Sequence, residues 1–369
     1  MEKKIKFFDT YVDSKAFQKV QRVLDSGFLS EGRLVSEFES KLSRKLGIRN
    51  LVALNSGTSA LHLALKLIGI KKGDEVILPA QTFIATGLAV KYCQATPIFA
   101  DIHYLNGNIN IESIRTKINQ RTKAIIVVHW AGYPCDLTEI NKLARENEIS
   151  VVEDAAHALG ATYQRYPIGN ISDFTCFSFQ AIKHLTTGDG GGLTTPNKKI
   201  LKNAKKMRWF GIDRESTTIS GLGERIYCLD EVGYKYHMND YAAALGLSNL
   251  VNLRKRLTKL KSLANKYRDS LSSLSGIKLF ENKRDRTSAN WLFGLHVENR
   301  NDFVAKMKEV KIPVSVVHQR IDRNIIFGGL NKDLTVQKKF DSTQIHLPLH
   351  TGLDLEDIER IVYEMKKGW

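Results

Sequence analysis

Residues 177–192 read F-S-F-Q-A-I-K-H-L-T-T-G-D-G-G-G, which places Lys183 between an apolar strand and a glycine-rich turn. In such a setting a lysine is partly desolvated and its pKa is lowered, as its reaction with a carbonyl group requires. Most lysines are simply solvated, and that is the alternative for Lys183. The glycines at 188 and 190–192 and the apolar flanks are unusual for a surface loop, and they favour a chain that turns tightly around a ligand.

Short apolar runs alternate with helical stretches along the first 195 residues. Short strands that alternate with helices indicate a mainly parallel sheet with helices on both faces. The runs are E-V-I-L-P (75–79), T-P-I-F-A-D (96–101), K-A-I-I-V-V-H (123–129), S-V-V-E-D (150–154), F-T-C-F-S-F (174–179) and G-G-L-T-T (191–195). Ligands of such sheets bind beyond the carboxyl ends of the strands, so polar residues after each run are the site candidates.

The rest of the chain predicts a second, smaller unit. A helical stretch over 241–275 links a large domain, 1–240, to a small C-terminal α/β domain, 276–369. In the small domain N-W-L-F-G-L-H-V (290–297) and P-V-S-V-V-H (313–318) are predicted strands, and amphipathic helices follow them.

Composition excludes several classes of protein. The 369 residues include 43% hydrophobic side chains and no apolar run long enough to span a bilayer, and the start lacks the pattern of a secretory signal, so we expect a cytoplasmic protein without membrane segments. The four cysteines are far apart and predict neither disulfides nor a metal site. The net charge of +16 suits an anionic ligand, but no nucleic-acid module accompanies it.

The segment N-S-G-T-S-A, residues 55–60, is a candidate phosphate site because a helical run follows it. Gly57 lets the backbone approach a ligand closely, Thr58 and Ser59 offer hydroxyl groups, and the free amides of a helix start attract a phosphate. An ordinary helix cap is the alternative.

Three further residues follow predicted strands. Asp154 ends the strand S-V-V-E-D, where a carboxylate beside the ring nitrogen of pyridoxal phosphate (PLP) would keep that nitrogen protonated; a turn or cap is the alternative. Phe83 follows the strand at 75–79 and is able to stack on a flat ring, or else fills the core. Ser178 is a further candidate phosphate donor at the end of the strand that precedes Lys183.

The chain resembles the DegT/StrS-type nucleotide-sugar aminotransferases, a branch of the fold type I PLP enzymes. The resemblance runs almost end to end. Its motifs are S-G-F-L-S-E-G, N-S-G-T-S-A-L-H-L-A-L, G-D-E-V-I-L-P-A-Q-T-F-I-A-T, V-V-H-W-A-G-Y-P-C-D, V-V-E-D-A-A-H-A-L-G-A, C-F-S-F-Q-A-I-K-H-L-T-T-G-D-G-G, G-Y-K-Y-H-M-N-D-Y-A-A-A-L-G-L and I-H-L-P-L-H. It implies a seven-stranded, mainly parallel sheet with helices on both faces, plus the smaller C-terminal domain.

The resemblance also implies roles for individual residues. Lys183 would bond covalently to PLP and then move a proton between substrate and cofactor. Asp154 would pair with the ring nitrogen, His157 would support it, and Phe83 would stack on the ring. The phosphate would be held by Thr58, Ser59 and Ser178, and by Lys235 of the neighbouring subunit of a homodimer with shared active sites; many relatives carry Asn at the position of Lys235.

The expected reaction takes the amino group of L-glutamate through pyridoxamine phosphate to a nucleotide-linked 4-keto-6-deoxy sugar, in amino-sugar, polysaccharide or O-antigen biosynthesis. A nucleotide-linked 3-keto sugar is the alternative substrate, and a non-catalytic regulatory relative is the alternative class of protein. Relatives that dehydrate the sugar carry histidine in place of the lysine, so Lys183 favours transfer. Arg208, Trp209, His318 and Arg320 are candidates for the sugar or nucleotide pocket.

Overall fold

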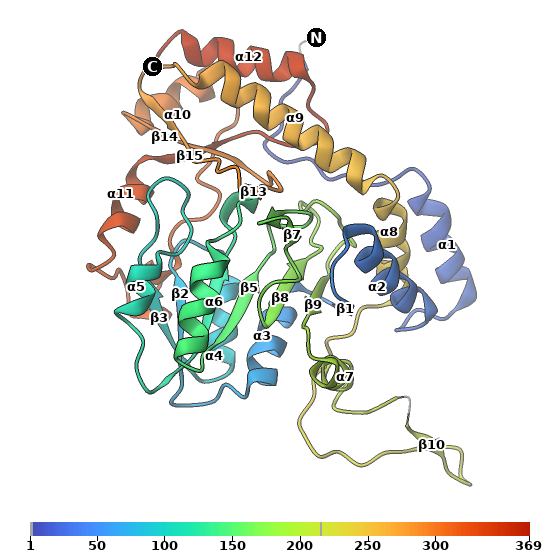
Figure 1. Cartoon of the computed structure of the whole chain (residues 1–369). Helices are drawn as coiled ribbons and strands as arrows, with labels where there is room; N and C mark the ends of the chain where they lie inside the picture. The colour runs from blue at the N-terminus through green and yellow to red at the C-terminus, as the bar shows by residue number, and fades with distance from the viewer. Residues whose placement is uncertain (1–2, 215) are drawn as a thin grey trace.

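A seven-stranded sheet forms the centre of the molecule in the computed structural model, which describes residues 3–214 and 216–369 (Figure 1). Only β9 runs against the other strands, so the predicted mainly parallel α/β sheet is confirmed. The strand order is β1 (Leu51–Leu54), β9 (Gly191–Thr194), β8 (Phe174–Ser178), β5 (Ser150–Asp154), β4 (Thr122–Val128), β2 (Glu75–Pro79) and β3 (Thr96–Ala100).

Helices cover both faces of this sheet, which explains why its strands are almost continuously apolar. One face packs against α3 (Gly57–Ile68), α4 (Ile84–Tyr92) and α7 (Lys198–Met207). The other face packs against α2 (Arg33–Leu46), α5 (Ile111–Arg115), α6 (Leu137–Glu146) and α8 (Asp240–Leu250), and α1 (Ala16–Ser26) lies against α8.

The strand order reverses between β2 and β4. From β2 the chain continues outward to β3 and then returns to the other side of β2 to form β4, β5 and β8. The carboxyl ends of neighbouring strands diverge at such a point and leave a crevice. The loops after β2, β4, β5 and β8 therefore meet at one edge of the sheet.

A second hydrophobic core belongs to the C-terminal part of the chain. It lies between a three-stranded sheet and its helices, which occupy the upper part of Figure 1. The sheet contains β12 (Ile277–Leu279), β14 (Phe293–Val297) and β15 (Gln344–Leu347), and the helices are α9 (Leu253–Leu271), α10 (Arg300–Glu309) and α12 (Leu355–Lys366). α11 (Thr335–Thr343) lies beside β14 and places Phe340 in a separate hydrophobic cluster. The domain boundaries at 240 and 275 stay a prediction.

Two predicted elements are wrong in detail. The single linking helix is broken at residues 251–252, because α8 is buried on nearly all sides whereas α9 has only one apolar face. The strand predicted at 313–318 forms only one isolated bridge, through Ser315. Val317 has a φ of 62°, a left-handed conformation that a β-branched residue rarely adopts, so the extended chain is interrupted there.

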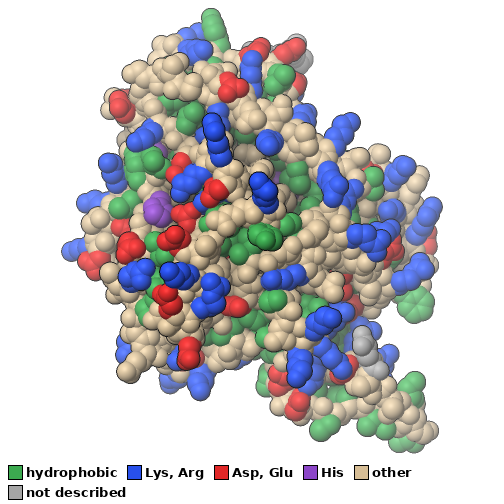
Figure 2. Space-filling model, in the orientation of Figure 1, with side chains coloured by type: hydrophobic (Ala, Val, Ile, Leu, Met, Phe, Trp, Pro, Cys, Tyr) green, Lys and Arg blue, Asp and Glu red, His purple; other side chains and the backbone are tan. Residues whose placement is uncertain are grey.

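A hairpin formed by β10 (Thr218–Ile219) and β11 (Arg225–Ile226) projects from the body after α7 (Figure 1). Hydrophobic side chains gather on this projecting segment in the space-filling view (Figure 2). The exposed ones include Ile219, Leu222, Ile226, Tyr227, Leu229 and Val232. A segment that exposes this much apolar surface is typical of a region that another surface covers.

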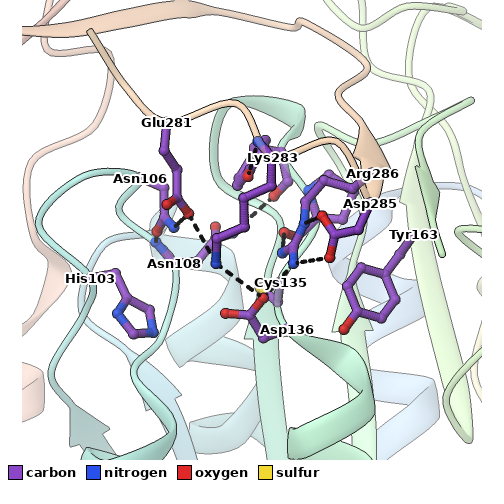
Figure 3. Close-up of polar contacts among 12 residues, drawn as sticks. His103, Asn106, Asn108, Cys135, Asp136, Tyr163, Glu281, Lys283, Asp285 and Arg286 are labelled. Carbon is purple, nitrogen blue, oxygen red and sulfur yellow. Dashed lines mark hydrogen bonds and ion pairs between the residues drawn. The ribbon is translucent and has the colours of Figure 1, made fainter.

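A polar cluster joins the segment after β12 to loops of the large sheet (Figure 3). The buried Arg286, in the short strand β13 (Arg286–Thr287), pairs with Asp285 and Asp136, and Lys283 lies 3.6 Å from both Asp136 and Glu281. β13 in turn pairs with β6 (Thr162–Tyr163), which pairs with β7 (Tyr166–Pro167). Carboxylates from both parts of the chain share these cations, so the cluster fixes the second core against the sheet.

No helix among the described residues has both the length and the apolar character that a membrane span needs.

Candidate active site

A cavity of about 350 Å³ lies at the carboxyl edge of the sheet, at the reversal of strand order. Its wall contains most of the residues singled out in the sequence, which are Gly57, Thr58, Phe83, Asp154, His157, Ser178 and Lys183. A larger hollow of about 640 Å³ lies between α2 and α7, but none of the predicted site residues lines it. The smaller cavity is therefore the candidate active site.

Lys183 lies half-buried in the wall of this cavity, on a segment without regular secondary structure between β8 and β9. Its Nζ lies 3.7 Å from the centre of the Trp291 ring. Burial lowers the pKa of Lys183 from 10.5 to about 7, while the nearby Asp154 carboxylate acts in the opposite direction. A large fraction of Lys183 is thus an uncharged, nucleophilic amine at neutral pH.

Asp154 ends β5 and faces the same cavity. The Thr86 hydroxyl donates to its Oδ2 at 2.7 Å, and the Ala156 amide donates to its Oδ1 at 3.2 Å. Burial raises the pKa of the Asp154 carboxyl, and these two hydrogen bonds and the Lys183 charge oppose that effect. A second cation in the cavity, such as a protonated ring nitrogen, would further favour the ionised carboxylate.

His157 lies face to face with Trp291, with ring centroids 3.7 Å apart and an interplanar angle of 14°. Burial is the main cause that lowers the pKa of His157 well below 6.5, so its ring is neutral. Phe83 is about half exposed (52%) where it lines the cavity, and its ring centre is 5.0 Å from that of His318. Stacking of Phe83 on a bound ring stays a prediction.

His318 lines the cavity, as the sequence analysis expects of a pocket residue. A tight turn at Val317 aims it, because the His318 amide donates to the Val316 carbonyl at 2.7 Å. The Gln81 side chain donates to the His318 carbonyl at 3.2 Å and holds that turn from the loop after β2. Strain held in place by surrounding contacts is typical of binding sites.

The other three pocket candidates lie elsewhere. Arg208 is buried in ion pairs with Glu31 and Glu39, and Arg320 is buried against Asp322. Trp209 packs against Phe210 and His237. Ionic and aromatic partners within the chain engage these side chains, so none of them reaches the cavity wall.

The start of α3 meets the end of β8 at one end of the cavity. A Cβ on Gly57 would lie 3.0 Å from the Ser178 Cβ, so glycine permits this close approach. The Ser56 hydroxyl caps the Ser59 amide at 3.0 Å. Ser59 is absent from the cavity wall, because its own hydroxyl donates to Asn55 at 2.7 Å. Ser59 stays a predicted phosphate ligand only.

Lys235 does not line the cavity of its own chain. Its Nζ lies 4.7 Å from the centre of the Trp209 ring and 5.3 Å from that of Phe210. This position leaves its role toward a neighbouring subunit as a prediction.

Two residues that shape the site were not predicted from the sequence. Thr86 ends the motif G-D-E-V-I-L-P-A-Q-T-F-I-A-T, and its spacing of three from Phe83, one helical turn, was a signal that it faces the same cavity. Trp291 belongs to a segment more than 100 residues beyond Lys183, and nothing in its local sequence indicates the contact.

The donor set fits PLP. An amine of lowered pKa faces a buried carboxylate across one cavity, and a helix start with hydroxyl groups and a glycine lies at its end. A phosphate suits the helix start, a ring nitrogen suits Asp154, and an aldehyde suits Lys183. No group of three or more metal-ligating side chains occurs among the described residues.

We predict that covalent capture of PLP by the cofactor-free protein depends on pH with a midpoint near 7. The neutral amine is the reactive form, so the capture rate rises as the pH passes through the Lys183 pKa of about 7, in place of its ordinary 10.5. Mixing with PLP, quenching with borohydride and measuring the mass of the labelled Lys183 peptide at each pH checks this. A rate that keeps rising to pH 10 contradicts it.

Comparisons with known proteins agree with this site. Residues 10–366 match the model of the DegT/DnrJ/EryC1/StrS aminotransferase family. UDP-4-amino-4-deoxy-L-arabinose–oxoglutarate aminotransferase of Shewanella sediminis is 34% identical over 95% of this chain and 94% of its own. The crystal structure of sugar aminotransferase CalS13 from Micromonospora echinospora covers 99% of this chain and all of its own, at 30% identity and a TM-score of 0.94.

A third similar protein bears on the cofactor. The PLP form of the putative sugar aminotransferase Spr1654 from Streptococcus pneumoniae is 27% identical to this chain, with a TM-score of 0.91. It covers 99% of this chain and 98% of its own.

Proposed function

Because the chain belongs to the DegT/DnrJ/EryC1/StrS aminotransferase family, we propose that it transfers the amino group of L-glutamate to a nucleotide-linked 4-keto-6-deoxy sugar with PLP as cofactor. The observation that carries this proposal is the cavity that Lys183 and Asp154 share. A non-catalytic relative would not need these two groups together, and family membership supports an enzyme.

The cofactor and the side chains of the cavity would contribute different parts of the chemistry. PLP, when bound, supplies an aldehyde that accepts the amino group and a ring that withdraws electrons. With PLP bound, Lys183 would hold its aldehyde carbon, and once an incoming amine has released Lys183, its Nζ would be the base that takes the α-proton of the amino donor. Asp154 would keep the ring nitrogen protonated, and Thr86 orients the Asp154 carboxylate. Trp291, which stacks on the buried His157, covers one side of the Lys183 amine.

Support for the 4-keto position comes from the relatives. The name of the Shewanella protein includes a 4-amino-4-deoxy sugar and oxoglutarate, the keto acid formed from glutamate. The predicted cofactor residues do not distinguish a 4-keto sugar from a 3-keto sugar, because they would contact the cofactor and not the sugar. The net charge of +16 favours a substrate that carries a diphosphate, as a nucleotide sugar does.

We also propose that the enzyme acts as a homodimer with shared active sites, in which Lys235 reaches the partner's phosphate. The apolar hairpin around β10 and β11 supports an intersubunit contact, since its apolar side chains are exposed among the described residues. Measurement of the molar mass in solution tests the dimer.

A panel of keto sugars linked to dTDP, UDP or GDP tests the function. With L-glutamate as donor, we expect 2-oxoglutarate and an amino sugar from the 4-keto-6-deoxy members. Mass spectrometry of the product and its fragmentation locate the new nitrogen. Turnover of only 3-keto members would replace the 4-keto assignment, and turnover of none with a PLP-loaded enzyme would refute the nucleotide-sugar substrate.

A further inference from the structure

The segment that carries Lys183 is held by hydrogen bonds to its main-chain carbonyls. The Trp291 indole donates to the Ile182 carbonyl at 3.0 Å, and the Asn249 amide donates to the Thr186 carbonyl at 2.9 Å. Arg256 donates from Nη1 to the His184 carbonyl at 2.6 Å, on the residue that directly follows the lysine. Because residues 179–190 have no helix or strand of their own, these donors fix the backbone position of Lys183.

Arg256 lies near the start of α9, where the chain passes from the large sheet to the second core. Its guanidinium is buried, and Tyr11 stacks on it with the carbon 4.1 Å from the ring centre. It forms no ion pair with the described carboxylates; its second terminal nitrogen donates to the Asn249 carbonyl. The Asp13 carboxylate acts on Arg256 only through its field, without a direct ion pair. A buried cation that lacks a direct ion pair is costly, so the donation of its hydrogen bonds to two main-chain carbonyls indicates a specific task.

A small cavity of about 40 Å³ adds a third link between Arg256 and the lysine segment. Lys183, His184 and Arg256 line it together with Tyr11 and Trp291. The Arg256 Nε, a donor, and the His184 Nδ1 have no protein partner among the described residues. His184 Nε2 lies 2.9 Å from the Ala289 carbonyl and so carries the proton, which leaves Nδ1 as an acceptor. An unpaired donor of Arg256 and an unpaired acceptor of His184 therefore belong to residues that share this small cavity.

We infer that Arg256 is a positioning residue for Lys183. It holds the main chain after the lysine through the His184 carbonyl and couples that position to the start of α9 through the Asn249 carbonyl. It does not touch the cofactor cavity itself. The inference rests on the proposed role of Lys183 as the cofactor lysine.

Comparison of two forms of the cofactor tests the inference. PLP bonds covalently to Lys183, whereas pyridoxamine phosphate carries an amine and does not, so only PLP affinity depends on where the lysine stands. For Arg256→Met at a temperature where it is folded, we expect PLP to bind about tenfold more weakly or worse, and pyridoxamine phosphate to change by less than about twofold. Equilibrium binding to the purified, cofactor-free protein gives the dissociation constants of PLP and pyridoxamine phosphate.

Two further variants make the result decisive. Arg268→Met is the matched control, since Arg268 lies on the same helix and also holds a main-chain carbonyl, that of Phe280 at 2.7 Å, which is outside the segment that carries Lys183; its PLP affinity should match the wild type. Arg256→Lys keeps the charge but has one terminal nitrogen and reaches only one carbonyl, so we expect an intermediate loss of PLP affinity. This variant replaces Arg256→Met if Arg256→Met does not fold. Equal losses for both cofactor forms, or no loss of PLP affinity, would overturn the positioning role.

The inference and the proposed function fail in different ways. Lys183→Ala should remove the preference of the protein for PLP over pyridoxamine phosphate. If that preference survives in Lys183→Ala, the cofactor lysine is assigned wrongly, whatever Arg256 does. If it disappears in Lys183→Ala but is intact in Arg256→Met, only the role of Arg256 is wrong.

Discussion

Lys183→Ala is expected to lower the transamination rate by about 10⁴-fold or more, because the variant loses both the covalent partner and the base. The alanine variant should retain the fold, since the lysine amine makes no ion pair among the described side chains and its removal lifts the desolvation cost of a buried charge. Single-turnover conversion of L-glutamate to 2-oxoglutarate, followed with PLP-loaded enzyme, measures the loss.

Lys199→Ala is the control for this variant, because Lys199 is an exposed lysine on α7, away from the cavity. It should keep the wild-type rate. Borohydride reduction of the wild type with PLP should label the peptide that contains residue 183. Label on another lysine, or a wild-type rate for Lys183→Ala, would remove the basis of the proposed mechanism.

Asp154→Asn is expected to lower kcat by about 10- to 10³-fold, with the smaller change in the KM of the amino donor. A carboxylate next to a cation shifts the pKa of that cation by about one to three units, so its loss lets the ring nitrogen deprotonate at neutral pH. Asparagine has the same shape and still accepts the hydroxyl hydrogen bond of Thr86. Steady-state kinetics measured between pH 6 and 9 give the kcat of the variant relative to that of the wild type.

The sign of the pH dependence separates this role from a structural one. Protonation of the ring nitrogen is restored as the pH falls, so the deficit of Asp154→Asn should shrink toward acid pH. Asp173→Asn is the control, because Asp173 accepts the Val151 amide near the start of the same strand, β5, far from its carboxyl end. A deficit that is independent of pH, or equal in both variants, would argue against a contact between Asp154 and the ring nitrogen.

The position of Lys183 and Asp154 could be predicted because both follow apolar strands of a parallel sheet. The period of the apolar residues locates each strand, and the parallel arrangement brings the carboxyl ends to one edge. The close approach at Gly57 was likewise visible, since a glycine before a helical run is a local signal.

Local signals also misled in identifiable places. The continuous helical pattern across 240–274 hid the break at residues 251–252, because each half is helical by itself and only the different burial of α8 and α9 separates them. The apolar run at 313–318 has strand propensity, but the turn at Val317 overrides it and directs His318 to the cavity. Contacts from Gln81 stabilise that turn from a distant part of the chain.

The sequence alone determined the strands of the large sheet and the chemical groups at their carboxyl ends, because side-chain periodicity, glycine positions and the order of motifs are local properties of the chain. Only the tertiary structure decided which side chains meet. Trp291 under Lys183, Thr86 on Asp154 and Arg256 on the His184 carbonyl join segments that local preference leaves independent. The first and third contacts arise from the packing of the C-terminal part of the chain and the linking helices against the sheet, and the second from the packing of α4 on the sheet. No short stretch of sequence encodes either arrangement.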